Sequence, residues 1–139
     1  MSYLIDTNVL SELRKGQRCD PHVSTWFARV PERELYLSVL VIGEIRRGVE
    51  RIRLRDAQSA AALDGWLTRV ITGYSDRILS VNHEIAEEWG RMNAVRPLST
   101  VDSLLAATAK IHGLTLVTRN IADIATTGVA YLNPFERTV

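Results

Sequence analysis

The stretch Tyr3-Leu4-Ile5-Asp6-Thr7-Asn8-Val9-Leu10 decides the fold class. It begins with a short β-prone apolar run, as in strands that are covered on both faces. Asp6 follows directly and is a preferred helix N-cap, so a helix is expected over residues 8–13. A buried strand that leads straight into a helix is typical of an α/β fold with a parallel sheet.

The same alternation of apolar runs and helix-length periodic segments continues along the chain. Strands are expected at residues 3–5, 35–37, 78–81, 114–117 and 129–132. Helices are expected at residues 8–13, 23–29, 39–55, 57–71, 83–94 and 101–112. We therefore predict an α/β fold in which a mainly parallel five-stranded sheet is flanked by helices.

Length and composition indicate one folded domain, residues 1–139. The 139 residues are 46% apolar and 24% charged with a net charge of +1, which excludes an intrinsically disordered chain. The single cysteine, Cys19, excludes an internal disulfide and a cysteine-based zinc site. No apolar run is long enough to cross a bilayer and no secretory leader pattern opens the sequence, so we expect a cytoplasmic protein without membrane association.

Four carboxylates stand at positions where an α/β fold places chemistry. Asp6 follows the first strand, Asp102 lies in the first turn of an Ala-rich helix, and Asp123 comes just after a buried strand. Glu44 lies on an apolar helix face, where an unpaired charge is costly. Ligands of parallel sheets bind outside the carboxyl ends of the strands, so these acids are expected to face one crevice.

Each acid also has an ordinary structural explanation, and the residue types alone leave both open. Asp6 can serve as a helix cap, and Asp102 can complement the helix dipole or form a capping box with Ser99. Glu44 can pair with Arg47, and Asp123 with Arg119.

Taken together, the four acids predict a site for a hard divalent cation. A set of oxygen ligands without His or Cys suits Mg²⁺, or Mn²⁺ as a substitute, better than Zn²⁺. Such ions activate water and relieve charge on the leaving oxygen when a phosphodiester is hydrolysed. Crowded carboxylates should also hold protons to higher pH than isolated ones until a cation binds. Nearby groups expected to orient water or the acids are Thr7, Asn8, Ser38, Thr118 and Asn120.

The basic residues are unevenly distributed. Fifteen of the seventeen are arginines, and five cluster within ten residues: Arg46, Arg47, Arg51, Arg53 and Arg55. Guanidinium groups donate in a fork that suits phosphate, so this segment is a candidate face for a nucleic acid, RNA included, or for another acidic partner. The alternative is a solvated helix end.

Four segments of the chain, residues 4–12, 37–48, 102–109 and 116–123, resemble the motifs of PIN-domain ribonucleases in order and spacing. More narrowly, the chain resembles VapC-type toxins of bacterial type II toxin–antitoxin systems. Residues 133–135 resemble the closing segment of the FitB-like branch.

The resemblance implies a Mg²⁺-dependent endoribonuclease whose metal-binding catalytic acids are Asp6, Glu44, Asp102 and Asp123. The spacing of Asp123 leaves open whether it is a direct ligand or lies behind the ligands. The implied partners are an RNA substrate and a VapB-like antitoxin, with operator DNA bound only through the toxin–antitoxin complex. A homodimer or a higher toxin–antitoxin assembly is also implied.

Two other functions remain as alternatives. One is a catalytically inactive PIN-like module that binds protein or nucleic acid. The other is a phosphatase of the haloacid-dehalogenase type, because residues 6–8 partly imitate its nucleophile motif, although the second Asp is missing and Lys110 is the only late lysine. The three tryptophans, Trp26, Trp66 and Trp89, are expected to anchor the core or an interface.

Overall fold

A computed structural model describes residues 1–136; the last three residues of the predicted domain, 137–139, lie outside the described part. Within it, five strands form one sheet of order β3-β2-β1-β4-β5, and every neighbouring pair is parallel. The strands are β1 (Tyr3–Ile5), β2 (Leu35–Ser38), β3 (Ile78–Leu79), β4 (Thr115–Val117) and β5 (Tyr131–Leu132). The predicted α/β fold with a parallel five-stranded sheet is confirmed.

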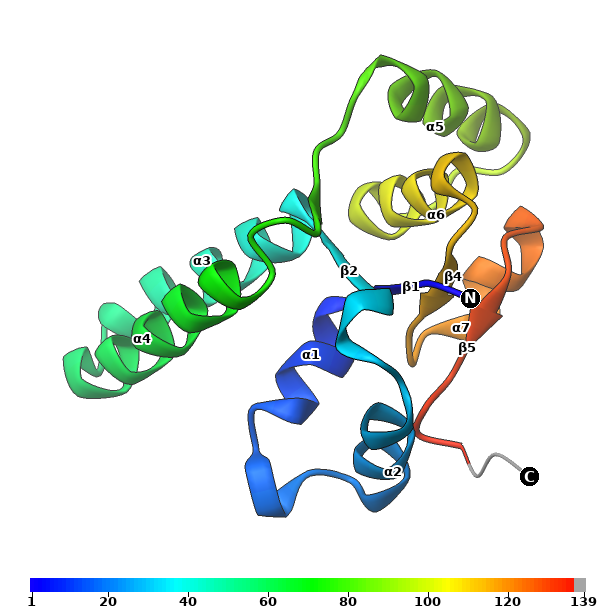
Figure 1. Ribbon diagram of the computed structural model, residues 1–139. Helices are drawn as coiled ribbons and strands as arrows, with labels where there is room; N and C mark the ends of the chain where they lie inside the picture. Colours follow the sequence, from blue (N-terminus) through cyan, green and yellow to red (C-terminus); the bar gives the residue numbers. More distant parts are fainter. Residues whose placement is uncertain (137–139) are drawn as a thin grey trace.

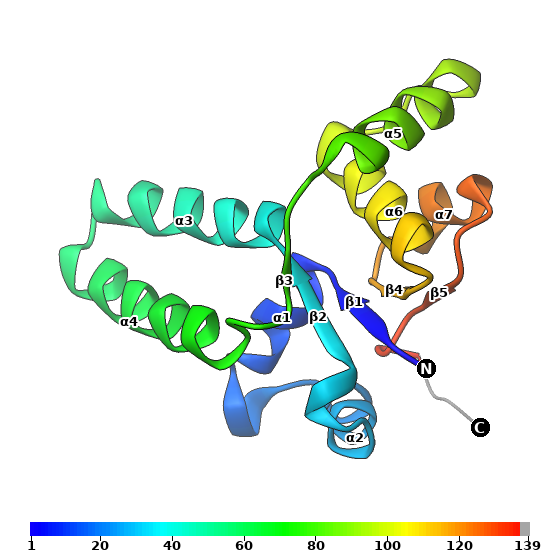
Figure 2. The same ribbon diagram turned by 45° about the horizontal axis from the view of Figure 1, so that its top comes forward.

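Helices connect and cover these strands. They are α1 (Thr7–Leu13), α2 (Pro21–Arg29), α3 (Val39–Arg53), α4 (Ala57–Gly73), α5 (His83–Val95), α6 (Thr100–His112) and α7 (Ile121–Ile124). Helices α1 and α2 lie on one side of the sheet and α5 and α6 on the other (Figure 1). Helices α3 and α4 pack on each other as a hairpin that projects away from the sheet in both views (Figures 1 and 2).

The structure differs from the predicted elements mainly where they are short. Strand β3 is limited to two residues because only Leu37 and Ser38 of β2 pair with it. Helix α7 was not predicted, because a helix of four residues is too short to show a periodic pattern. None of the helices within residues 1–136 is long and apolar enough to cross a membrane.

The core explains why α6 lies close against the central strands. Leu4 and Ile5 of β1 are fully buried, so this strand is apolar on both faces. Three residues of α6, Leu105, Ala106 and Ala109, belong to the same buried cluster. The small alanine side chains let the helix approach the sheet closely. This packing fixes the first turn of α6, which carries Asp102, relative to β1 and β4.

The register of the sheet brings polar residues to one edge. Ile5 of β1 pairs with Val117 of β4, and the Asp6 amide continues the ladder by donating to the Val117 carbonyl at 2.9 Å. Asp6 and Thr118 therefore directly follow neighbouring strands and lie side by side, at the carboxyl edge where parallel sheets bind ligands.

Candidate active site

Asp6 is the centre of a hydrogen-bonded network at this edge. Its side chain is almost completely buried, and one carboxylate oxygen accepts from the Thr7 amide at 2.7 Å. The other oxygen accepts from the Thr118 hydroxyl at 2.7 Å and from the Asn8 amide group at 3.3 Å. Asp6 is thus the N-cap of α1 and also the acid on which the side chains of Thr118 and Asn8 converge, so the two explanations do not exclude each other.

Glu44 reaches the network through Thr7. The Thr7 hydroxyl donates to Oε1 of Glu44 at 2.5 Å, while the amide of the same residue bonds Asp6. Arg47 lies 3.8 Å from the other Glu44 oxygen and is largely exposed, so that ion pair exists but contributes little. The first residue of α1 therefore links two of the predicted acids directly.

Asp102 approaches from the opposite side of the sheet, from the first turn of α6. Its Oδ2 atom accepts from the side-chain amide of Asn120 at 3.3 Å. The expected capping box is absent from this helix start in the described chain, because Ser99 makes no side-chain cap bond. Asp102 is therefore held by a residue after β4 whose backbone amide also bonds Thr118.

The electrostatics of Asp6 reflect these neighbours. Burial raises the pKa of Asp6 above its ordinary value, and the negative charges of Asp102 and Glu44 act in the same direction. The hydrogen bonds from Thr118 and Thr7 oppose the rise but do not cancel it. An ionised Asp6 is consequently a negative charge that the described residues do not fully compensate.

The Asp123 side chain does not join the hydrogen-bonded network of Asp6 within residues 1–136. It is part of α7 and is half-buried, and no hydrogen bond or ion pair within residues 1–136 joins its carboxylate to Asp6, Glu44 or Asp102. The expected pair with Arg119 does not form either, since the Arg119 guanidinium stacks on the ring of Phe135 at 4.3 Å. The structure thus brings three of the four predicted acids together, and the role of Asp123 stays a prediction.

Most of the predicted supporting residues hold this network. The Asn120 amide donates to the Thr118 hydroxyl at 3.1 Å, which in turn bonds Asp6. Asn8 bonds Asp6 and accepts from the Arg119 amide at 3.3 Å, a contact that no pattern in the sequence predicts. Ser38 differs, because it is fully buried and its hydroxyl caps α3 by accepting from the Leu40 amide.

The donor chemistry of the site fits a hard divalent cation. In the described part of the chain, no three His, Cys, Asp or Glu side chains are close enough to form a finished metal cage. Protein donors bond both oxygens of Asp6, one oxygen of Asp102 and one of Glu44. Hard oxygen ligands with uncompensated negative charge are nevertheless what Mg²⁺ and Mn²⁺ prefer. Asp6, Glu44 and Asp102 are the residues that would hold such an ion.

Fewer arginines of the cluster are unpaired than the sequence indicates. Arg46 and Arg53 both pair with Glu50 on α3 and with Asp64 on α4, at 3.0 to 3.3 Å. These pairs tie the two helices of the hairpin together. Only Arg51 and Arg55 are exposed with no carboxylate within 4 Å among residues 1–136, so an RNA-binding role for the cluster stays a prediction and rests on these two.

Replacing Thr118 by Val is expected to shift the acidic limb of the pH–activity profile to higher pH. The Thr118 hydroxyl lowers the pKa of Asp6, so its removal leaves that pKa higher and the carboxylate ionises at higher pH. The measurement is the initial rate, across the acidic and neutral range, of the RNA cleavage that the resemblance implies. The matched control is Thr68→Val, because the Thr68 hydroxyl bonds only a carbonyl on the exposed side of α4. An unchanged profile for Thr118→Val would exclude Asp6 as the group that limits activity in acid.

Comparison with known proteins assigns the chain to a family. The model of the PIN domain matches residues 3–125, and the chain belongs to the PIN-domain family. Toxin FitB of Neisseria gonorrhoeae is 27% identical over 96% of this chain and 98% of its own. VapC ribonuclease Y4jK of Sinorhizobium fredii is 26% identical over 96% of this chain and 97% of its own. A solved structure of FitAB bound to a DNA fragment superposes with a TM-score of 0.87 at 26% identity, covering 99% of this chain and 98% of that one.

Proposed function

We propose that this protein is a Mg²⁺-dependent endoribonuclease and the toxin component of a VapBC-type toxin–antitoxin system. The observation that carries the proposal is the buried Asp6, whose pKa is raised by burial and by the nearby charges of Glu44 and Asp102. A catalytic site for phosphodiester hydrolysis needs such a concentration of negative charge to bind its cation. The names of the relatives, a VapC ribonuclease and a toxin, support the same function.

In the proposed reaction, Asp6, Glu44 and Asp102 hold Mg²⁺, with Mn²⁺ as a substitute, and Asp123 is proposed as a fourth acid. When bound, the cation activates water for attack on an RNA phosphodiester and relieves charge on the leaving oxygen. The chain's own residues keep the acids in place. Thr7 and Thr118 fix the two oxygens of Asp6, and Asn120 fixes Asp102.

The proposed partners follow from the family and its solved complexes. We propose a VapB-like antitoxin that neutralises the toxin, and contact with operator DNA only through that complex, since the similar FitAB assembly is seen on DNA. A homodimer or a higher toxin–antitoxin assembly is proposed as well. A cytoplasmic location is proposed too, because an RNA substrate would be met there.

Adding Mg²⁺ or Mn²⁺ is expected to raise the melting temperature of the wild-type protein. A ligand that binds only the folded state stabilises it by RT ln(1 + [L]/Kd), about 2.7 kcal/mol at 100 times Kd. For a chain of this size that corresponds to a shift on the order of 10 °C. The measurement is thermal melting in a series of metal concentrations, with K⁺ added at matched ionic strength as the control.

The variant Asp6→Asn/Asp102→Asn is the second control for this experiment. It removes two of the three proposed metal-binding carboxylates with little change in shape, so its melting temperature should not respond to either metal. An equal shift in wild type and variant, or no shift in the wild type, would contradict the metal site. The absence of a shift in the wild type would favour an inactive binding module with the same fold.

A further inference from the structure

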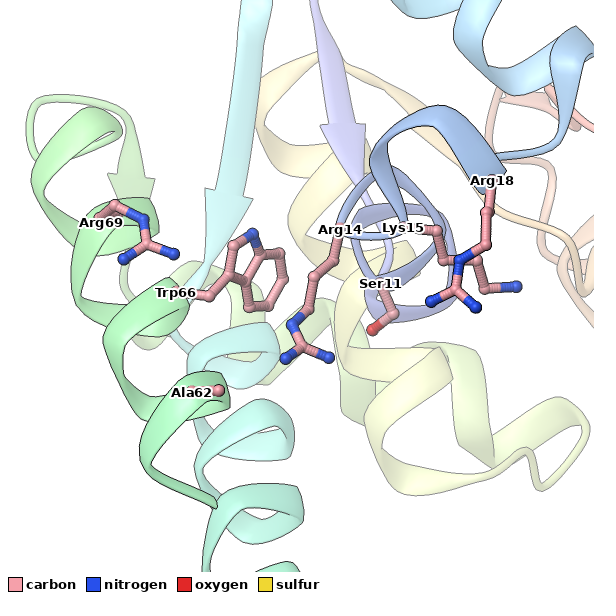
Figure 3. A pocket seen from close by; sticks show the side chains of 7 residues that line it. All are labelled: Ser11, Arg14, Lys15, Arg18, Ala62, Trp66 and Arg69. Carbon is pink, nitrogen blue, oxygen red and sulfur yellow. The ribbon is translucent and has the colours of Figure 1, made fainter. Parts of the chain in front are cut away.

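A basic groove that none of the acids lines lies between α1 and α4. It has a volume of about 460 Å³ and is lined by Ser11, Arg14, Lys15, Arg18, Ala62, Trp66 and Arg69. Figure 3 shows Arg14 reaching from the end of α1 toward Trp66 on α4, with Arg69 on the far side of Trp66 and with Lys15 and Arg18 on the other side of Arg14. Four of the seven lining residues are cations, and none is an acid.

Three of these cations are not neutralised by the protein. Arg14, Arg18 and Arg69 are exposed, and in the described part of the chain no carboxylate lies within 4 Å of their guanidinium groups. Lys15 differs, because it pairs with Glu12 at 2.9 Å. The groove therefore carries positive charge that is free to meet an anion, in contrast to the paired Arg46 and Arg53 of the hairpin.

Trp66 gives the groove an aromatic wall. The Arg14 guanidinium lies 5.9 Å from the centre of its ring, at cation–π distance. Trp26 is buried in the core and Trp89 donates to the Ser103 hydroxyl, whereas Trp66 is partly exposed and borders the groove. The predicted role of core or interface anchor thus describes Trp66 only in part.

The groove continues the acid site along one face of α1. Thr7, Ser11 and Arg14 are spaced by four and three residues, so they share a face of the helix. At one end of that face Thr7 bonds Glu44 on α3, and at the other end Arg14 meets Trp66 on α4. At 1.5 Å per residue, the two ends are roughly 10 Å apart, about three nucleotides of stacked strand.

We propose that this groove binds the RNA strand beside the bond that is cut, an inference that rests on the proposed nuclease function. Arg14, Arg18 and Arg69 contact consecutive phosphates, and Trp66 packs against a base or ribose between them. Phosphate contacts hold the register of a strand without reading its sequence. The groove would thereby set which phosphate reaches Asp6.

The lining favours RNA over a protein segment. Grooves that capture peptides present apolar pockets for spaced anchor residues. Here the apolar lining is restricted to Ala62 and the face of Trp66, and the rest is polar or cationic. Guanidinium groups next to an aromatic ring are instead the combination that proteins use to bind single-stranded nucleic acid.

The test compares salt dependence of RNA binding in two triple variants. Both are made in the Asp6→Asn background so that the probe, a fluorescent oligouridylate, stays intact. Arg14→Gln/Arg18→Gln/Arg69→Gln removes the proposed phosphate contacts. The matched control, Arg29→Gln/Arg33→Gln/Arg96→Gln, removes the same charge from three exposed arginines that have no ion pair within residues 1–136. For single strands the slope of log K against log salt changes by about 0.7 per phosphate contact, so the groove variant should lose about 2 from the slope and the control nothing.

Fluorescence gives a second, local measurement. RNA binding is expected to quench tryptophan emission, and Trp66→Phe should remove most of that change while keeping the groove filled. An unchanged salt slope in the groove variant would overturn the inference. If that variant also lost binding to polyglutamate, the groove would belong to an acidic protein segment.

Failure of the nuclease proposal is distinguishable from failure of the groove. A wild-type protein that binds RNA through the three arginines but never cleaves it would refute the proposed chemistry alone. A wild-type protein that cleaves RNA while binding it independently of these arginines would refute the groove alone.

Discussion

Replacing Asp6 by Asn is expected to lower RNA cleavage on the order of a thousandfold, since charge stabilisation by a bound divalent ion is worth several kcal/mol. Asn has the shape of Asp and can still cap α1 through its carbonyl oxygen, which the Thr7 amide needs. It cannot supply the negative charge that the cation requires. The loss should therefore fall on activity and leave the helical content unchanged in circular dichroism.

The same variant is expected to be at least as stable as the wild type when no divalent ion is present. A pKa raised in the folded state means that folding favours the protonated carboxyl. The contribution of the Asp6 carboxyl to the free energy of unfolding is then fully present below the pKa that Asp6 has in the unfolded chain. It is lost as the pH rises through the pKa of Asp6 in the folded protein. Asn cannot ionise. The free energy of unfolding of the variant should therefore exceed that of the wild type by a margin that grows with pH over the acidic range.

The experiment is expression of wild type and variant in a bacterium, with growth followed and the 5′ ends of total RNA sequenced. Growth arrest and discrete new RNA ends are expected with the wild type alone. Glu84→Gln, an exposed acid at the start of α5, serves as the isosteric control and should behave as wild type. Asp123→Asn tests the fourth acid separately. Loss of helical content together with activity in Asp6→Asn would mean that Asp6 acts mainly as a cap.

Replacing Arg77 by Met is expected to destabilise the fold by about 3 kcal/mol, because a charged donor to several carbonyls is removed. The Arg77 side chain is only 11% exposed. It donates to the carbonyls of Glu32, Leu35 and Gly73 at 2.6 to 2.9 Å and lies over the Tyr74 ring at 4.7 Å. It therefore joins the end of α4 to the start of β2, and Met keeps its stem but none of these bonds.

Urea unfolding measures this effect, and Arg55→Met is the matched control. Arg55 is exposed and makes no side-chain contact to an acid in the described chain, so its replacement should stay within about 0.5 kcal/mol of wild type. Equal unfolding midpoints for the two variants would show that water replaces the Arg77 bonds without cost. This result concerns the fold alone and is independent of any catalytic role.

The fold and three of the acids could be predicted because their signals are local. A buried run followed by an acid defines both β1 and the position of Asp6, and an Ala-rich helix with Asp102 in its first turn defines α6. Parallel strands place such residues at a common edge, so their meeting follows from the fold class. The bridging role of Thr7 depends on the rotamer and on the angle of α3, which no spacing in the sequence specifies.

The charged surfaces could not be predicted in the same way. Five arginines within ten residues suggested a free basic face, but Asp64 lies on the next helix and pairs with two of them. The unpaired arginines of the groove are far apart in the chain, since Arg14 and Arg69 belong to α1 and α4. Net charge at a surface is a property of tertiary neighbours, and composition alone does not report it.

The double contact of Thr7 has a consequence for how the site opens and closes. Thr7 is in the first turn of α1, and its amide and hydroxyl connect Asp6 to Glu44 of α3. Fraying of that turn would therefore break the link between the two acids. Helix ends open at much lower free energy than the core, as hydrogen exchange commonly shows. We therefore expect the local folding of this one helical turn to decide whether Asp6 and Glu44 stay linked, and exchange protection of the Thr7 amide measures it.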